Sequence, residues 1–163
     1  MQRNEVNGGF LDSNLNPLGV VITYGKIIAD RVSWRPPRAC FVLKDGKADI
    51  IQGVEKASDL GKVDFALGCM SLLPLKIQEE GIQADISLSK RPRTLLGINT
   101  LGNILIALTD QNKSLVECQD FMQSLNCTKA MNLDGGGSTS VNWQGQNVIK
   151  GRKVSTVLKI KEV

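Results

Sequence analysis

The chain has 163 residues, of which 42% are hydrophobic and 22% charged, and this is enough for one globular domain with its own core. Its net charge is +4, and the basic residues are scattered rather than gathered into the stripe that a nucleic-acid-binding surface needs. The absence of histidine excludes the Ser-His-Asp and Cys-His nucleophile systems, and no apolar run is long enough to span a bilayer, so we expect neither nucleic acid binding nor membrane insertion.

The first half of the chain is predicted to form short antiparallel strands joined by tight turns. Gly25 and the pair Asp45-Gly46 mark two hairpin turns, and Asp-Gly favours a primed turn because both positions tolerate positive φ. The strands that flank these turns are residues 18–24 with 26–32, and residues 39–43 with 47–51. Segment 34–38 interrupts the sheet because its two prolines donate no ladder hydrogen bonds. Residues 60–81 have no regular pattern, and their structure stays open.

Further strands are predicted in the second half. Residues 94–98 and 103–109 are typical of a hairpin, with its turn at Leu101-Gly102. Residues 130–133 have the character of a buried strand that leads directly into Asp134. The chain closes with a segment, residues 154–161, in which every second side chain faces the core.

One helix is predicted between these strands. Ser114 and Glu117 have the spacing of a capping box, and apolar residues then recur on one helical face: Leu115, Cys118, Met122 and Leu125. Asn126 is a suitable left-handed stop. Because no repeat or linker divides the chain, these elements predict a single α+β domain over residues 1–163.

The four cysteines have no CxxC spacing. They lie in or beside apolar runs, so we expect buried free thiols rather than a metal site or a disulfide framework: Cys40, Cys69, Cys118 and Cys127. Since histidine is absent as well, acid-base chemistry must fall to carboxylates.

A glycine-rich segment carries the strongest chemical signal. After Asp134, the glycines at 135–137 let a ligand approach backbone N–H groups, and the segment 138–140 adds three hydroxyls, so the loop suits an anion. Asp134 places a carboxylate beside these donors, where it could transfer a proton. The alternative is a tight turn between two strands. The segment is not a P-loop, because no Gly-Lys-Ser/Thr follows at the required spacing.

Three other segments have both a functional and a structural interpretation. Asn7-Gly8-Gly9-Phe10 would ordinarily mark a turn. Arg93, just before a strand, could offer two N–H groups to a phosphate, but it also fits a surface cluster of basic residues. Asp110, at the end of a strand, is either a turn former or a second active-site carboxylate.

Taken in order, these segments resemble those of the phosphodiester glycosidase family. Asn7-Gly8-Gly9-Phe10 is similar to the Asn-Gly-Gly-Phe-Phe-Asp segment of that family. Arg93-Thr94 with Gly97 is similar to its Arg-Thr-Ala-x-Gly strand, and Asp110 stands where its Asp-Gly-Arg begins.

The resemblance continues to the end of the chain. Residues 132–138 match the family's Asn-Leu-Asp-Gly-Gly-Gly-Ser position by position, and Arg152 resembles the arginine that precedes its last strand. The sequence departs from the pattern at Leu11, which replaces a phenylalanine, and at Gln111-Asn112, which replaces Gly-Arg. Only six residues precede Asn7, so we expect a truncated or minimal form with an exposed sheet edge.

The resemblance implies a mixed, largely antiparallel sheet with helices packed on it. It also implies a hydrolase acting on a sugar 1-phosphate diester with an N-acetylhexosamine-like sugar and a phosphate-linked sugar or polyol. Asp134, Asp110 and Arg93 would be catalytic: the arginine holds the phosphate, and the carboxylates face water or the cationic sugar carbon. The substrate-binding residues would be Asn7, Gly8, Gly9, Asn132, Gly135, Gly136, Gly137, Ser138, Thr139 and Arg152.

Several points stay open. No cofactor is expected, although Asp12 with Asn7 would suit bound calcium. The first residues lack an apolar signal core, whereas members of the family are often exported or lumenal, so localisation is not predicted. The alternatives to an enzyme are a module that binds phosphorylated glycans without cleaving them, and a scaffold whose glycine turns are purely structural.

Overall fold

The computed structural model describes residues 4–33, 38–109, 111–149 and 151–160. It is mainly β, with 46% of residues in strands and 14% in helical conformation. The strands are β1 (Asn4–Asn7), β2 (Val21–Thr23), β3 (Lys26–Ala29), β4 (Arg38–Lys44), β5 (Lys47–Val54), β6 (Phe65–Leu73), β7 (Thr94–Asn99), β8 (Ile104–Leu108), β9 (Cys127–Asn132), β10 (Val141–Trp143), β11 (Gln146–Ile149) and β12 (Val157–Ile160). The helices are α1 (Ala84–Ser87) and α2 (Leu115–Ser124), and 3-10 turns span Ala57–Leu60 and Gly136–Ser138.

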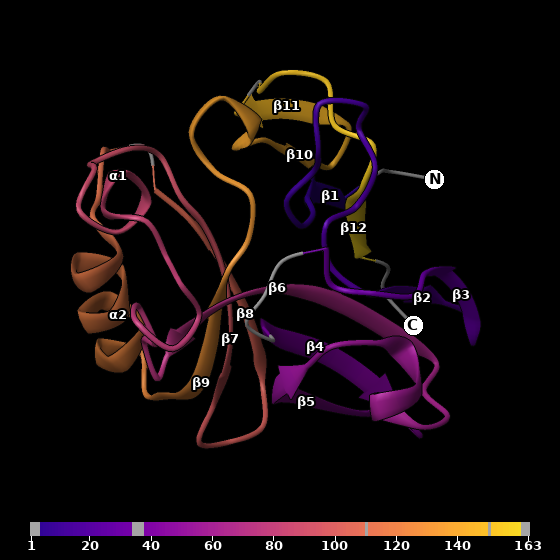
Figure 1. Ribbon diagram of the computed structural model, residues 1–163. Coiled ribbons are helices and arrows are strands. Elements are labelled where there is room, and N and C mark those ends of the chain that lie inside the picture. The colour runs from indigo at the N-terminus through magenta and orange to yellow at the C-terminus, as the bar shows by residue number, and fades with distance from the viewer. Residues whose placement is uncertain (1–3, 34–37, 110, 150, 161–163) are drawn as a thin grey trace.

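The strands form two sheets, drawn in Figure 1 with the smaller one above the larger. The smaller sheet has the order β11-β10-β1-β12. The larger has the order β3-β2-β6-β9-β7-β8, with β4 paired to β6 and β5 paired to β4. Every pair of strands among the described residues is antiparallel, so the sheet is not mixed as predicted.

The predicted hairpins are confirmed. β4 and β5 are joined by Asp45 and Gly46 with φ of 50° and 73°, as a primed turn requires. β2 and β3 turn in the same way at Tyr24-Gly25, and β7 pairs with β8 across the turn that contains Gly102. The predicted interruption of the sheet at residues 34–37 lies outside the described residues.

β6 lies within residues 60–81, the segment whose structure the sequence left open. It pairs with β2, β4 and β9, and so it ties the first half of the chain to the second. Eight of its nine residues are buried, because both of its faces are covered. A strand buried on both faces has no alternation of polar and apolar residues, which is why periodicity did not reveal it.

The predicted helix is confirmed as α2. Ser114 accepts a hydrogen bond from the Glu117 amide and Glu117 accepts one from the Ser114 amide, which completes the capping box. Asn126 follows with φ of 58°. The expected packing of helices over the sheet is not confirmed as a feature of the fold, since α1 has only four residues and α2 ten.

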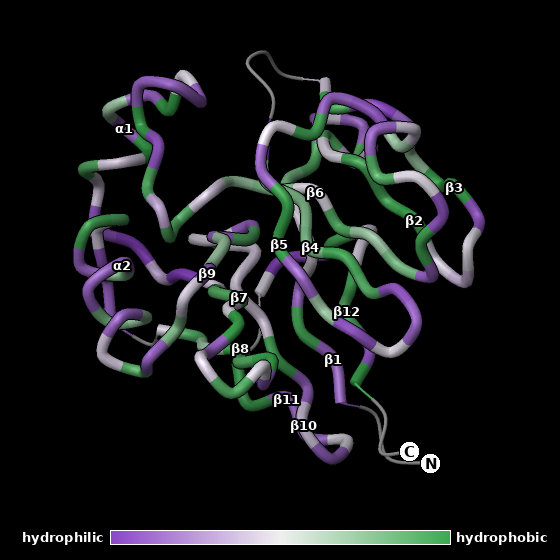
Figure 2. The backbone as a smooth tube through the Cα atoms, turned by 90° about the horizontal axis from the view of Figure 1, so that it is seen from below, coloured by the Kyte–Doolittle hydropathy of each residue, from purple (hydrophilic) through white to green (hydrophobic). Residues whose placement is uncertain are grey.

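Three apolar clusters fill the described part of the molecule. One lies between the two sheets and includes Val6, Leu158 and Met131. A second contains Cys118 and Met122 of α2 together with sheet residues, and a third fills the region enclosed by β2, β4, β5 and β6. Figure 2 shows β1 and β12 running side by side. All four cysteines are buried and free, as expected. No helix among the described residues is long and apolar enough to cross a membrane.

The capping box of Ser114 and Glu117 makes the stability of the fold depend on pH in the acid range. The pKa of Glu117 is lowered from 4.5 to about 2, chiefly by the hydrogen bond from the Ser114 amide and then by Lys90. Because the pKa is depressed in the folded state, the carboxylate contributes stability above about pH 4.5 and loses it as the pH falls toward 2. We therefore expect Glu117→Gln to lower the melting temperature at pH 7. A difference from the wild type that persists unchanged at pH 2 would contradict this assignment.

Candidate active site around Asp134 and the glycine loop

The glycine loop begins where β9 ends. Asp134 follows the buried Leu133, and the 3-10 turn Gly136–Ser138 then reverses the chain toward β10. Gly136 adopts φ of 57°, which glycine takes at no steric cost. The Gly136 amide donates to the Pro92 carbonyl at 2.8 Å, so the loop is fastened to the segment that leads into β7.

Each glycine of the loop lies against a different arginine. A Cβ atom placed on Gly135 would be 3.7 Å from Cδ of Arg93, and one on Gly136 would be 3.7 Å from Cδ of Arg91. A Cβ on Gly137 would be 3.9 Å from Cδ of Arg152. The loop is therefore lined by the side-chain stems of three arginines from two separate parts of the sequence. Of these, Arg91 was not selected from the sequence, because its closeness to Gly136 depends on the bond between Gly136 and Pro92.

Asp134 is buried, with 6% of its surface exposed. Its Oδ1 accepts a hydrogen bond of 2.9 Å from the Gly135 amide, and its Oδ2 lies 3.7 Å from Nη2 of Arg152. Its own amide donates to the Gly8 carbonyl at 3.1 Å. The carboxylate is thus held by the first glycine and faces a cation.

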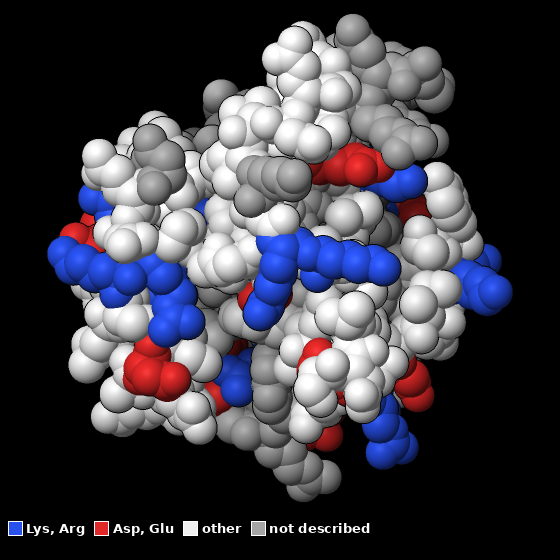
Figure 3. Space-filling view, turned by 90° about the horizontal axis from the view of Figure 1, so that it is seen from above, with Lys and Arg blue, Asp and Glu red and all other residues white. Residues whose placement is uncertain are grey.

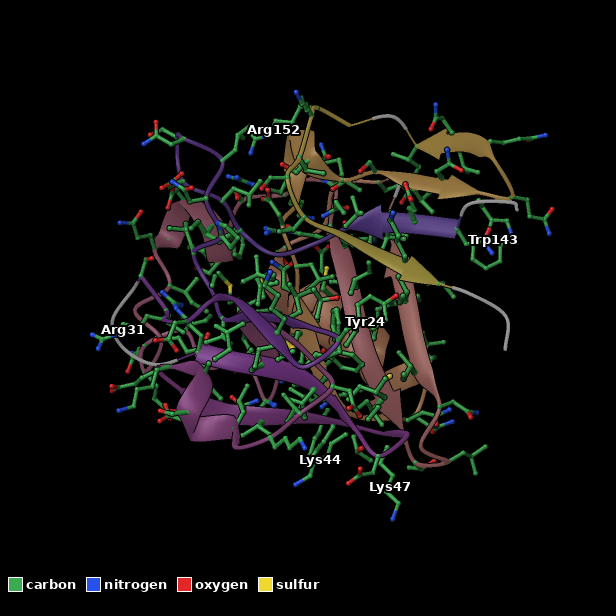
Figure 4. The ribbon with its side chains drawn as sticks, turned by 90° about the vertical axis from the view of Figure 1, so that its right-hand side faces the viewer. Tyr24, Arg31, Lys44, Lys47, Trp143 and Arg152 are labelled. Atoms are coloured by element: carbon green, nitrogen blue, oxygen red, sulfur yellow. The ribbon has the colours of Figure 1, made fainter. Side chains whose placement is uncertain are left out.

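Arg152 lies over the loop on the solvent side, with 69% of its side chain exposed. Its amide donates to the Gly137 carbonyl at 2.6 Å, and its Nε donates to Oγ of the buried Ser138 at 2.8 Å. Figure 4 shows Arg152 at the end of the molecule far from Trp143. Figure 3, which looks onto the molecule from above, shows Lys and Arg side chains across the middle of that face.

The backbone donors of the loop are mostly used within the protein. The amides of Gly135, Gly136, Ser138 and Thr139 donate to acceptors in the loop or at Pro92. Among the described residues, the Gly137 amide makes no such bond. The sequence predicted that all three glycine amides face a ligand, but only the amide of Gly137 is left for one.

Asn7 joins four segments of the chain. Its Nδ2 donates to the Asp134 carbonyl at 2.7 Å, and its Oδ1 accepts from Oγ1 of Thr94 at 2.7 Å and from the Ser140 amide at 3.0 Å. Asn7 is fully buried, and these bonds use its amide group. It positions the Asp134 loop, and the substrate contact predicted for it stays a prediction.

Arg93 is buried and lies beside the loop, but its guanidinium faces backbone carbonyls. Its Nε donates to Lys113 at 3.0 Å, and its Nη2 donates to both Ile86 and Ser89 at 2.8 Å. Burial lowers the pKa of the guanidinium, which remains charged at neutral pH as arginine does in proteins. Within the described part of the chain, Nη1 is the nitrogen of this guanidinium that has no hydrogen bond.

Gly8 and Gly9 allow two close approaches. A Cβ on Gly8 would lie 2.6 Å from Oγ1 of Thr156, and one on Gly9 would lie 2.9 Å from the Gly68 carbonyl on β6. Cys69, next to this contact, has a pKa raised to about 12, first by burial and with smaller contributions that include nearby negative charges. Its thiol therefore stays protonated and is not a nucleophile.

Asn132 faces away from Asn7. It pairs with Met70 on β6 and with Leu95 on β7, and both of these belong to the cluster that contains α2. Its Nδ2 donates to the Leu133 carbonyl at 2.9 Å, and its buried Oδ1 has no hydrogen-bond partner in the described part of the chain. The structure thus places Asn132 on the opposite face of the sheet from Asn7 and Thr94.

Two of the predictions concern acidic residues outside this arrangement. Asp110 lies outside the described residues, while its neighbour Thr109 pairs with Arg93 through the Arg93 amide. Asp12, named as a possible calcium ligand, accepts hydrogen bonds from the Asn14 and Asn16 amides and from the Asn16 side chain. Among the described residues there is no group of three or more Asp, Glu, His or Cys side chains that could hold a metal ion.

Comparison with known proteins gives one family and one fold. The family model described as phosphodiester glycosidase matches residues 3–161. The catalytic domain of zebrafish N-acetylglucosamine-1-phosphodiester alpha-N-acetylglucosaminidase, in a structure described as auto-inhibited by its pro-peptide, superimposes with a TM-score of 0.80 at 23% identity; the match covers 98% of this chain and 63% of that one. A hypothetical protein from Synechocystis matches with a TM-score of 0.64 at 16% identity, over 92% of this chain and 49% of that one. No curated protein matches the sequence.

Proposed function

The chain belongs to the phosphodiester glycosidase family, and from that premise we propose that it hydrolyses the bond between a sugar and phosphate in a sugar 1-phosphate diester. The sugar is of the N-acetylhexosamine class, and the phosphate carries a second sugar or a polyol. The name of the zebrafish protein with the same fold supports this class of substrate. The chain spans 63% of that protein's length, so the substrate is inferred and not transferred from it.

One observation carries the proposal: a buried carboxylate and an exposed guanidinium meet over a glycine loop in which the Gly137 amide makes no hydrogen bond to any described residue. Arg152 and the Gly137 amide supply charge and a hydrogen bond to a phosphate at the surface of the loop. Asp134 lies 3.7 Å from the same guanidinium, where the anomeric carbon of a phosphate-linked sugar would be placed.

In the proposed reaction the bond between the anomeric carbon and the phosphate oxygen breaks, and the phosphate leaves with the electron pair. Water adds to the anomeric carbon and gives up a proton. Asp134 faces the oxocarbenium-like carbon or accepts that proton, while the arginines stabilise the charge that grows on the phosphate. Arg93 contributes through Nη1, and its other bonds hold its guanidinium against the carbonyls of Ile86, Ser89 and Lys113. A phosphodiester is a good leaving group, so the proposal requires no strong general acid.

The direct test is to incubate the protein with N-acetylglucosamine 1-phosphate methyl diester and measure free reducing sugar. An enzyme releases the sugar with multiple turnovers. A non-catalytic binding module only raises its melting temperature in the presence of the diester. If neither sugar release nor a thermal shift is observed with a series of sugar 1-phosphate diesters, the glycine turns are structural and the proposal is wrong.

Arg152 provides a sharper test of phosphate binding. We expect Arg152→Gln to raise KM for the diester about tenfold, because a charged hydrogen bond to an anion is worth roughly 1.5–3 kcal/mol. Lys153→Gln removes the same charge one position away and is the matched control, with little expected change. The measurement is steady-state kinetics at low salt. An equal effect of both substitutions would indicate long-range attraction instead of a contact.

A further inference from the structure

Two buried hydroxyl groups near Asp134 have no hydrogen-bond partner among the described residues. They are Oγ1 of Thr139, on the glycine loop, and Oγ1 of Thr156, just before β12. Thr139 itself is 97% buried, since only 3% of its surface is exposed. More than about 90% of buried polar groups in folded proteins are hydrogen-bonded, so two such groups beside one loop call for an explanation.

The pairing of strands brings these two threonines together across Gly8. Val6 lies opposite Val141 on one side of β1 and opposite Leu158 on the other. Two residues further on, the same registers place Gly8 between Thr139 and Thr156. Hydrogen bonds continue both ladders to this point: the Asn7 amide donates to Ser140 at 3.2 Å, and the Gly8 amide donates to Thr156 at 2.9 Å. Figure 4 shows β1 lying between its two neighbours in this sheet.

The hydroxyl of Thr156 leans over Gly8. A Cβ atom on Gly8 would be only 2.6 Å from Oγ1 of Thr156, so the hydroxyl fills the space that a side chain would take. The carbonyl of the same glycine accepts the hydrogen bond from the Asp134 amide. Gly8 therefore connects these threonines to the candidate catalytic residue, because it lies beside them and its carbonyl holds the backbone of Asp134.

The two sides of the site differ in charge. Arg152 lies on the solvent side of the loop with 69% of its side chain exposed, and it is the group suited to the phosphate. Thr139 lies on the buried side, where its neighbours Gly8 and Thr156 are uncharged. An uncharged hydroxyl that both donates and accepts matches the hydroxyl groups of a sugar ring better than it matches an anion.

We propose that Thr139 and Thr156 form the subsite for the sugar hydroxyls, on the side of Asp134 opposite to the phosphate. This inference rests on the proposed function and adds to it the residues that recognise the sugar. Thr156 is only half-buried, so it is the more exposed of the two threonines. Substrate hydroxyls then supply the partners that the free protein lacks.

The test exploits a difference between stability and activity. Thr139→Val and Thr156→Val keep the shape of the side chain and remove a hydroxyl that has no partner within the described part of the free protein. We expect a melting temperature equal to or above that of the wild type, because a buried unpaired polar group is costly. We expect kcat/KM for the diester to fall about tenfold for each substitution, since one substrate hydrogen bond is lost.

Three controls separate recognition from structure. Thr139→Ser and Thr156→Ser retain the hydroxyl and should keep most of the activity. Thr128→Val, whose hydroxyl donates to the Ile98 carbonyl, should leave the kinetics unchanged. A diester of a deoxy sugar that lacks the recognised hydroxyl should lose activity with the wild type but not with the corresponding valine variant.

The outcomes distinguish this subsite from the proposed reaction. Unchanged kcat/KM in both valine variants, or a lower melting temperature with full activity, would overturn the subsite while leaving the hydrolase intact. If the wild type releases no sugar from any diester, the reaction is wrong, and calorimetric titration with N-acetylglucosamine 1-phosphate then tests the subsite alone. Weaker binding to the valine variants than to the wild type supports it, and equal or no binding rejects it.

Discussion

Replacing Asp134 by asparagine is expected to lower kcat/KM for a sugar 1-phosphate diester by roughly 10³-fold or more, which is the usual range for an essential acid-base or charge-stabilising group. The side chain keeps its shape, and its Oδ1 still accepts from the Gly135 amide. Because Oδ2 makes only a 3.7 Å contact with Arg152, little stability depends on its charge. The variant should therefore melt within a few degrees of the wild type.

The control for this substitution is Asp120→Asn, which removes a carboxylate from an exposed position of α2. Its kcat/KM should equal that of the wild type. Sugar release by Asp134→Asn at the wild-type rate would end the assignment of this carboxylate. Loss of folding instead of activity would make Asp134 a structural residue of the loop, and the melting temperature decides between these outcomes.

The parts of the fold that were predictable are those fixed by neighbouring residues. The Asp45-Gly46 turn sets its own hairpin because both positions take positive φ, and Ser114 with Glu117 begins α2 through bonds that span three residues. The strand β1, which was not predicted, depends on distant partners. β1 has four residues and is held between β10 and β12, which come more than 130 residues later.

The candidate site shows the same division. Asp134 and its glycines were recognisable because the residue types themselves carry the chemistry. The orientation of Arg93 was not recognisable. Its three acceptors are the backbone carbonyls of Ile86, Ser89 and Lys113, and every residue has such a carbonyl whatever its type. The role of Arg91 was missed for the same reason. Its contact with Gly136 arises only when the loop folds back onto Pro92.

The arrangement around the loop also explains why glycine is needed at Gly151. A Cβ atom there would lie 2.7 Å from the Thr139 carbonyl and 3.0 Å from the Gly137 carbonyl. The backbone that carries Arg152 therefore rests directly on the glycine loop. This contact brings the guanidinium of Arg152 to Asp134 and fixes it relative to Ser138.

Asn7 is expected to have the largest effect on stability among the residues that surround the site. Asn7→Ala leaves three groups without their partner: the buried Thr94 hydroxyl, the buried Asp134 carbonyl and the part-buried Ser140 amide. Each unsatisfied group costs about 1–3 kcal/mol, and allowing for partial relaxation we expect the free energy of unfolding to fall by roughly 3 kcal/mol. Urea denaturation should show a lower midpoint with an unchanged slope.

Two further variants show which part of the Asn7 side chain matters. Asn4→Ala is the matched control, since Asn4 also accepts a backbone hydrogen bond, from Gln144, but at an exposed position, and it should cost only about 0.5 kcal/mol. Asn7→Asp retains the acceptor for Thr94 and Ser140 but places a carboxylate oxygen against the Asp134 carbonyl, so it should be at least as destabilising as alanine at neutral pH. If Asn7→Ala unfolds at the same urea concentration as Asn4→Ala, Asn7 does not hold the loop. Its amide would then be free to meet substrate, as the sequence first suggested.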